Sequence, residues 1–262
     1  MNTDYKAYRN TEAQVFTIAK QIPDNSVVIV GTGLPILGAV LAKRCFLSEC
    51  QLVVESGLMD FMPHETPRSV NDLRSMAHCA APLPPFRYLG FQMNELLWDR
   101  DRTIGFIGGA AVDIYGNVAS TSVGDYKHPK MRLPGSGGAN GIASFCNTII
   151  VMPHKKRHFP AKLDYNTSPG WLTGPGSRAK AGLPENRGPM AVVTDLGLLK
   201  FDEETRKMYL AGYYPSTSPE EVQANTGFEL DVSRAAPLEA PPEDIVKLIR
   251  TELDPEDIFL YD

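Results

Sequence analysis

The sequence predicts an α/β protein with a largely parallel open sheet flanked by helices. Several short runs are rich in β-branched residues and do not alternate between apolar and polar positions, which is typical of strands buried on both faces of a parallel sheet. Segments with helical spacing of apolar residues lie between these runs, and this alternation indicates an α/β fold. No low-complexity linker or internal repeat interrupts the chain, so we expect a single domain over residues 1–262.

The first half begins with a predicted helix at residues 11–21, for which Thr11 is the expected N-cap. A buried strand at 26–30, a helix at 35–45 with Pro35 in its first turn and a strand at 51–54 follow. The remaining expected elements are a helix at 69–77, a strand at 86–91, a helix at 92–98 and a strand at 103–107.

The second half contains two further buried strands, expected at 147–152 and 191–194. Ser218 and Pro219 predict the start of a helix that ends near Gly227, and residues 241–253 predict a final amphipathic helix. The 22 glycines and 21 prolines concentrate in residues 105–141 and 169–189, which we expect to form long functional loops.

Composition and charge exclude several classes of protein. Hydrophobic residues make up 43% and charged residues 22%, as in folded globular chains. The net charge of −5 argues against nucleic-acid or anionic-membrane partners, since binding phosphate backbones needs clustered Lys and Arg. No run approaches the roughly 18 apolar residues of a membrane span, and the polar start lacks a signal-peptide core, so we expect a cytoplasmic protein.

A glycine-rich turn follows the first predicted strand. Gly31 and Gly33 would let the backbone approach a phosphate in front of the next helix, so we take them as a candidate phosphate or substrate loop. A dinucleotide fingerprint would place its third glycine at position 36, where this chain has Ile36. Nicotinamide binding and a purely structural turn both remain open.

Glu55 follows the second predicted strand and precedes Ser56 and Gly57. An acid at the carboxyl end of a strand lies where open α/β sheets bind ligands. It also lies 22 residues after Gly33, where a ribose-binding acid would stand in a dinucleotide site. A helix-capping or loop carboxylate is the structural alternative.

Two further glycine runs follow. Gly108 and Gly109 lie in the run at 107–121 and are a second candidate phosphate or substrate loop. Gly137, Gly138 and Ala139 can expose adjacent backbone N–H groups that would bind an oxyanion. A tight crossover turn would explain either run without a ligand.

Metal, redox and serine-hydrolase chemistry have little support. His154 and His158 are four residues apart but lack the intervening acid of a zinc-protease helix, and we expect no metal site. The four cysteines show no C-x-x-C spacing, so we expect reduced and mostly buried thiols. Neither Ser56 nor Ser136 has a G-x-S-x-G context.

Together these segments resemble the family I coenzyme A transferases. The similar segments run over nearly the whole chain and include VGTGLPILGA, VESGLMD, FIGGAAVDIYGNVAST, GSGGANGIA and YYPSTSPEEV. The resemblance implies the NagB/RpiA/CoA-transferase-like fold and assigns Glu55 as the catalytic glutamate. It further implies that Gly137, Gly138, Ala139 and Asn140 form the oxyanion and CoA-binding segment.

The resemblance also implies a mechanism and a partner. Glu55 would form an acyl-glutamyl anhydride and then a glutamyl-CoA thioester, with the CoA thioester as substrate and no permanently bound cofactor. The expected partner is a homologous A subunit in a hetero-oligomer, with the active site at their interface. The acyl group stays open, a dicarboxylate such as glutaconate being the natural expectation. An acyl-CoA hydrolase or decarboxylase on the same scaffold, a nicotinamide-binding oxidoreductase and a non-enzymatic CoA-binding subunit are the alternatives.

Overall fold

The computed structural model describes residues 4–69, 71–82 and 102–260. These form two compact units: unit 1 comprises residues 1–106 and 239–262, and unit 2 comprises residues 107–238. Within the described residues, no helix is long and apolar enough to cross a membrane. The predicted strand at 86–91 and helix at 92–98 lie outside the described residues.

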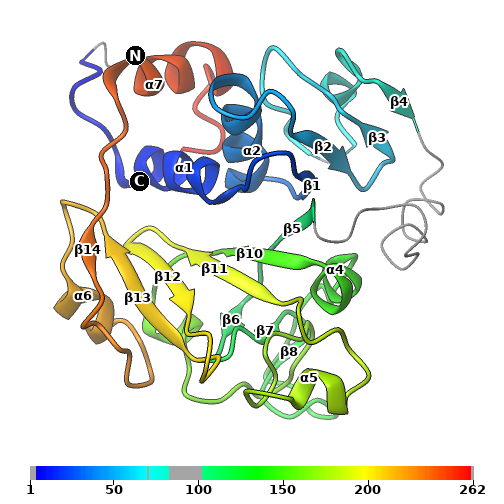
Figure 1. The fold of residues 1–262 in the computed structure, drawn as a ribbon, viewed down its shortest axis with the longest axis vertical. Helices are drawn as coiled ribbons and strands as arrows, with labels where there is room; N and C mark the ends of the chain where they lie inside the picture. The colour runs from blue at the N-terminus through cyan, green and yellow to red at the C-terminus, as the bar shows by residue number, and fades with distance from the viewer. Residues whose placement is uncertain (1–3, 70, 83–101, 261–262) are drawn as a thin grey trace. The chain divides into compact units, whose positions relative to one another are not determined.

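Unit 1 is built on a sheet with the strand order β5-β1-β2-β3-β4 (Figure 1). Its strands are β1 (Val27–Val30), β2 (Gln51–Val54), β3 (Leu58–Met59), β4 (Ala81–Pro82) and β5 (Thr103–Ile107). β1 pairs in parallel with both β2 and β5, whereas β3 and β4 are antiparallel additions. β1 is buried along its whole length, as its unbroken β-branched sequence predicts.

Two helices pack together beside this sheet, α1 (Asn10–Gln21) and α2 (Leu34–Cys45) (Figure 1). They approach closely at Gly38, where an added Cβ would lie 2.4 Å from Ile18 Cγ2. The N-cap of α1 is Arg9 and not Thr11, because Glu12 inside the first turn accepts the Arg9 N–H at 2.8 Å. Gly33 caps α2 with a φ of 92°, a left-handed conformation that favours glycine.

The predicted helix at 69–77 is wrong for most of its length. The structure has only a 3₁₀ turn, η1 (Leu73–Met76). Leu73 is 77% exposed and Met76 is 60% exposed, so the apolar side chains that suggested a helix face have nothing in the described chain to pack against. The final helix predicted at 241–253 is present from residue 243: α7 (Glu243–Leu248) continues as the π-helical turn η4 (Ile249–Leu253).

Unit 2 contains a second run of strands in the order β14-β13-β12-β11-β10. These are β10 (Asn147–Val151), β11 (Pro189–Val193), β12 (Gly197–Phe201), β13 (Met208–Tyr213) and β14 (Ala236–Pro237). β10 and β11 are parallel, as predicted, whereas β12 joins β11 and β13 in antiparallel pairs that the sequence did not reveal. The fold class is thus confirmed, with antiparallel strands added to the parallel ones.

Two small ribbons and four short helical segments complete unit 2. The ribbons are β6 (Ala111–Val112) with β7 (Val118–Ala119), and β8 (Ser122–Val123) with β9 (Met131–Arg132). The helical segments are α4 (Ala139–Phe145), η3 (Lys156–His158), α5 (Ser177–Lys180) and α6 (Pro219–Ala224). Ser218 caps α6 as predicted by accepting the Glu221 N–H, but this helix ends at the C-cap Asn225 and not at Gly227.

Candidate active site

Glu55 lies at the tip of the turn that joins β2 to β3. The Gly57 N–H donates to Val54 O at 2.8 Å and closes the turn, and Gly57 has a φ of 93°. A left-handed residue of this kind is readily supplied by glycine, which explains why Gly57 follows the acid so closely. Glu55 therefore lies directly after the carboxyl end of the buried strand β2 in unit 1, as the sequence predicts.

The sheet register brings the first glycine turn next to Glu55. Val30 and Val54 are partners in the parallel pair of β1 and β2, so Gly31 and Glu55 follow directly after two paired residues. Carboxyl ends of parallel strands form one edge, which is where open α/β sheets bind ligands. An added Cβ at Gly31 would meet no heavy atom within 4 Å, so this turn leaves room for a ligand.

Glu55 is partly buried, and its carboxylate makes no hydrogen bond or ion pair with any residue that the structure describes. The neighbouring Ser56 Oγ is buried and also lacks a partner there. By contrast, Asp60 at the other end of β3 is paired with the buried Lys43, whose Nζ also donates to Cys50 O at 2.9 Å. Of these two acids, only Glu55 is left without a partner in the described chain.

The predicted oxyanion segment lies in unit 2, in front of and within the first turn of α4. The Ala139 N–H donates to Ser136 O at 2.9 Å, so it is already used inside the turn. The N–H groups of Gly137 and Gly138 have no such acceptor among the described residues. Gly137 has a φ of 51°, is exposed, and has nothing within 4 Å of an added Cβ. Two adjacent N–H groups are therefore open to a ligand.

Polar side chains hold both ends of α4 in place. The Asn140 side-chain amide donates to Thr167 O at 2.7 Å, which gives this predicted CoA-binding residue a structural contact. At the other end, the buried Arg178 guanidinium donates to Ser144 O at 2.8 Å and to Gly170 O at 2.8 Å. Burial lowers the pKa of Arg178 to about 10, but the side chain stays protonated near neutral pH.

Gly108 and Gly109 have a packing explanation. An added Cβ at Gly109 would lie 2.3 Å from Val118 Cγ1 and 2.9 Å from Ala119 O. At Gly108 it would lie 3.2 Å from Val151 O. The close approach of β7 thus accounts for Gly109 without any ligand, which matches the structural alternative for this run.

The comparisons with known proteins now bear on these two segments. A family model described as Coenzyme A transferase matches residues 11–225. The chain belongs to the coenzyme A transferase family.

Two relatives in this family can be aligned with the chain over at least 90% of their own length. The chain is 60% identical to the B subunit of glutaconate CoA-transferase from Acidaminococcus fermentans, over 98% of this chain and 97% of that protein. It is 32% identical to the B subunit of 3-oxoadipate CoA-transferase from Pseudomonas knackmussii, over 91% and 90% of the two chains. A crystal structure of glutaconate coenzyme A-transferase from A. fermentans matches with a TM-score of 0.94 and 59% identity, over 99% of this chain and 100% of that chain.

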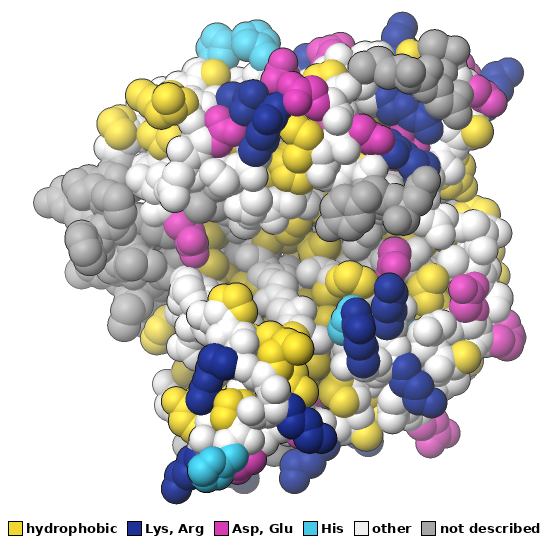
Figure 2. Space-filling model, turned by 180° about the vertical axis from the view of Figure 1, so that it is seen from behind, with side chains coloured by type: hydrophobic (Ala, Val, Ile, Leu, Met, Phe, Trp, Pro, Cys, Tyr) yellow, Lys and Arg dark blue, Asp and Glu magenta, His cyan; other side chains and the backbone are white. Residues whose placement is uncertain are grey.

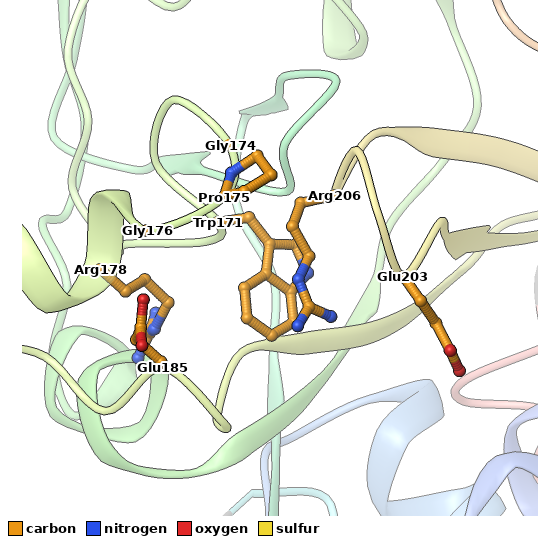
Figure 3. A pocket seen from close by; sticks show the side chains of 8 residues that line it. All are labelled: Trp171, Gly174, Pro175, Gly176, Arg178, Glu185, Glu203 and Arg206. Atoms are coloured by element: carbon orange, nitrogen blue, oxygen red, sulfur yellow. The ribbon is translucent and has the colours of Figure 1, made fainter.

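A pocket of about 250 Å³ opens elsewhere in unit 2 of this transferase-family chain (Figure 3). The Arg206 guanidinium lies over the Trp171 ring, 4.2 Å from its centroid, and the Glu203 side chain points away from them. None of the predicted site residues lines this pocket, but six of its eight lining residues lie in the run at 169–189 that the sequence predicts to be a functional loop. The lining contains two arginines and two exposed glutamates, Glu185 and Glu203, so its formal charges sum to zero.

The histidine pair is explained by packing. His154 is buried, stacks on Phe159 at 4.0 Å, and its two ring nitrogens contact the hydroxyls of Thr194 and Thr226. Burial lowers the pKa of His154 to about 4. Among the described residues no group of three His, Cys, Asp or Glu could hold a metal ion.

Two of the thiols, Cys50 and Cys146, are buried as expected, but Cys45 is exposed.

Proposed function

We propose that this chain is the B subunit of a heteromeric CoA transferase and that Glu55 is its nucleophile. The single observation that carries the proposal is the position of Glu55: it stands at the carboxyl edge of the β1–β2 pair, beside the open Gly31 turn, with no partner in the described chain. A nucleophilic carboxylate must be both held in place and free of a competing cation, and this arrangement fits both needs.

The reaction follows from carboxylate chemistry. The Glu55 carboxylate attacks the acyl-CoA carbonyl, and the tetrahedral oxyanion collapses to an acyl-glutamyl anhydride with CoA thiolate as the leaving group. The thiolate then attacks the glutamyl carbonyl, which releases the first acid and leaves a glutamyl-CoA thioester. The acceptor carboxylate attacks that thioester, which expels CoA thiolate and forms a second acyl-glutamyl anhydride. The thiolate then attacks the acyl carbonyl of this anhydride, which gives the new acyl-CoA and frees the Glu55 carboxylate.

We assign oxyanion stabilisation to the Gly137 and Gly138 N–H groups. One backbone donor aimed at a tetrahedral oxyanion typically contributes about 3–4 kcal/mol. The two N–H groups without acceptors and the empty space beside Gly137 support this role. Asn140 and Ala139 would act mainly by fixing the turn, since the Asn140 amide and the Ala139 N–H are already engaged with Thr167 and Ser136.

We further propose that the acyl group is a dicarboxylate such as glutaconate and that a homologous A subunit completes the enzyme. The support is the 60% identity to the B subunit of a glutaconate CoA-transferase over nearly the full chain. Hydrolase chemistry on the same scaffold would use water in place of the acceptor acid, so the anhydride must be shielded from water for transfer to dominate.

The test is acceptor dependence in the complex co-produced with its A subunit. With glutaconyl-CoA and acetate, we expect acetyl-CoA to form, with ping-pong kinetics and little free CoA when acetate is left out. Release of free CoA at the same rate with and without acetate would instead establish a hydrolase. Replacing Glu55 by Ala with full retention of transfer would assign the chemistry to the partner chain.

A further inference from the structure

We propose that the hairpin at residues 120–135 binds the phosphates at the nucleotide end of coenzyme A through Lys127, Lys130 and Arg132. This inference deepens the proposed function and depends on it. The phosphates lie at the opposite end of the substrate from the thioester. The three side chains lie outside the glycine motifs that the sequence predicts as binding segments.

The hairpin ends at Gly135, two residues before the proposed oxyanion segment begins at Gly137. Its pairing starts at Ser120, which accepts the Gly135 N–H at 2.8 Å, and continues through Thr121, which accepts the Leu133 N–H at 2.9 Å. β8 and β9 extend the ribbon to Val123, which accepts the Lys130 N–H at 2.9 Å. Gly137 and Gly138 therefore lie at the base of this hairpin, and residues 124–130 form its tip.

The length of the hairpin matches the shape of the substrate. Four or five residues of strand separate the base from the tip, or about 15 Å at the usual rise of a strand. Coenzyme A carries its thiol and its phosphates at opposite ends of an extended pantetheine arm of comparable length. A thioester held at the base would place the phosphates near the tip.

The hairpin carries three cations, two at its tip and Arg132 in β9. Lys127, Lys130 and Arg132 are exposed and form no ion pair with the residues that the structure describes. Two acids are hydrogen-bonded to the hairpin within the described chain: the Asp125 carboxylate accepts the N–H groups of Lys127 and His128, and the Asp164 carboxylate accepts the Gly124 N–H. Their negative charges offset part of the positive charge and leave the hairpin basic. The hairpin is therefore a basic surface in a chain whose net charge is −5.

The tip is also firmly built. The Tyr126 ring stacks on Tyr165, with centroids 4.7 Å apart and planes at 17°. Arg132 lies 5.1 Å from the Tyr126 ring and donates to Tyr126 O at 3.1 Å. Loops held by stacking and hydrogen bonds lose less conformational entropy when they bind a ligand.

Figure 2 shows the same feature on the molecular surface. The end of unit 2 that carries β8 displays dark blue Lys and Arg side chains near a His, together with several apolar side chains and a magenta acidic side chain beside the His. Phosphates attract such cations over several ångströms and are held by charge-assisted hydrogen bonds. The chemistry of this surface therefore fits a ligand that bears several phosphate groups, such as the 3′-phosphate and pyrophosphate of coenzyme A.

The test compares two substrates in the complex with the A subunit. In the double variant Lys127→Gln/Lys130→Gln, we expect KM for the acyl-CoA to rise about tenfold or more, because each lost contact was to a charged group. The rate with the matching acyl-pantetheine, which has no phosphates, should not change. The inhibition constant of adenosine 3′,5′-bisphosphate should rise by the same factor as KM.

The matched control is Lys155→Gln/Lys156→Gln, which removes two exposed lysines from η3 and the residue before it and should leave all three values unchanged. An unaltered KM in the hairpin variant of an active transferase overturns this inference and leaves the proposed function intact. An equal loss of activity with acyl-CoA and with acyl-pantetheine would also overturn it, because the hairpin would then have a structural role. Loss of the A subunit from the variant complex on size-exclusion chromatography would overturn it too, because the hairpin would then be a subunit contact. A wild-type complex without transfer activity would refute the proposed function itself.

Discussion

The glycine turns after β1 and after β5 look alike in sequence but differ in what surrounds them. Gly31 has open space where a Cβ would point, whereas a Cβ at Gly109 would collide with Val118 and Ala119. The first turn lies beside Glu55 at the sheet edge, and the second lets β7 approach. The comparison teaches that a glycine run can mark either a place where a ligand approaches the backbone or a tight packing contact. The free space around the position of an added Cβ distinguishes the two.

The largest expected effect concerns the acid beside the open turn. Glu55→Gln removes the nucleophile and should lower transferase kcat by about 10³-fold or more. The free energy of unfolding should change little, because Glu55 is partly exposed and has no partner in the described chain. Steady-state transfer assays and denaturant unfolding of the same preparation measure both quantities. Glu55→Asp, one methylene shorter, is the matched variant and should lose transfer while retaining some thioester hydrolysis.

The packed turn should show the opposite behaviour. Gly109→Ala forces a methyl group against Val118 and the Ala119 carbonyl, and overpacking of this kind typically costs about 1–3 kcal/mol. The midpoint of urea unfolding should fall, while the rate per folded molecule stays near that of the wild type. A variant of wild-type stability would contradict the packing explanation of this glycine.

Packing in unit 2 also predicts a pH effect on stability. His154 is buried and its pKa is lowered to about 4 from its usual 6.5, so between these pH values the unfolded chain binds more protons than the folded one. Stability should therefore fall as the pH drops from about 6.5 to 4, by up to about 3 kcal/mol from this group. In His154→Gln this part of the pH dependence should disappear from urea unfolding curves. The matched change His158→Gln, at a less buried ring, should leave the dependence in place.

The smallest effect on stability is expected at the open turn. Gly31→Ala meets no neighbouring atom and needs no left-handed backbone, so the free energy of unfolding should change by less than about 0.5 kcal/mol. If substrate approaches this turn, kcat/KM should still fall, by about tenfold. Unchanged kinetics would remove Gly31 from the candidate site and leave it as a turn glycine.

The parts of the fold that the sequence predicts are those with a strong local signal. β1, β2, β5, β10 and β11 are short apolar runs, most of them rich in β-branched residues, and each was placed within about two residues. The strands β12 and β13 were not predicted, because their sequences, GLLKF and MYLAGY, are poor in β-branched residues. Their antiparallel pairing is set by the turn between them. The helix expected at 69–77 failed because its apolar spacing has no packing partner in the described chain.

The candidate site could be predicted only as separate segments. The register of β1 with β2, which makes Gly31 and Glu55 neighbours, is a tertiary property. The use of the Ala139 N–H within its own turn and the contact of Asn140 with Thr167 depend on the local path of the chain, which residue types alone do not determine. The role of Gly109 likewise became visible only when β7 was found against it.

The nucleophilic role of Glu55 is tested most directly by trapping its thioester. The complex with the A subunit is incubated with acyl-CoA, reduced with borohydride, digested and analysed by mass spectrometry. We predict that the peptide containing Glu55 carries the reduced side chain only when acyl-CoA was present. An unmodified Glu55 peptide from a preparation that is turning over, or a modification on another residue, would contradict the mechanism.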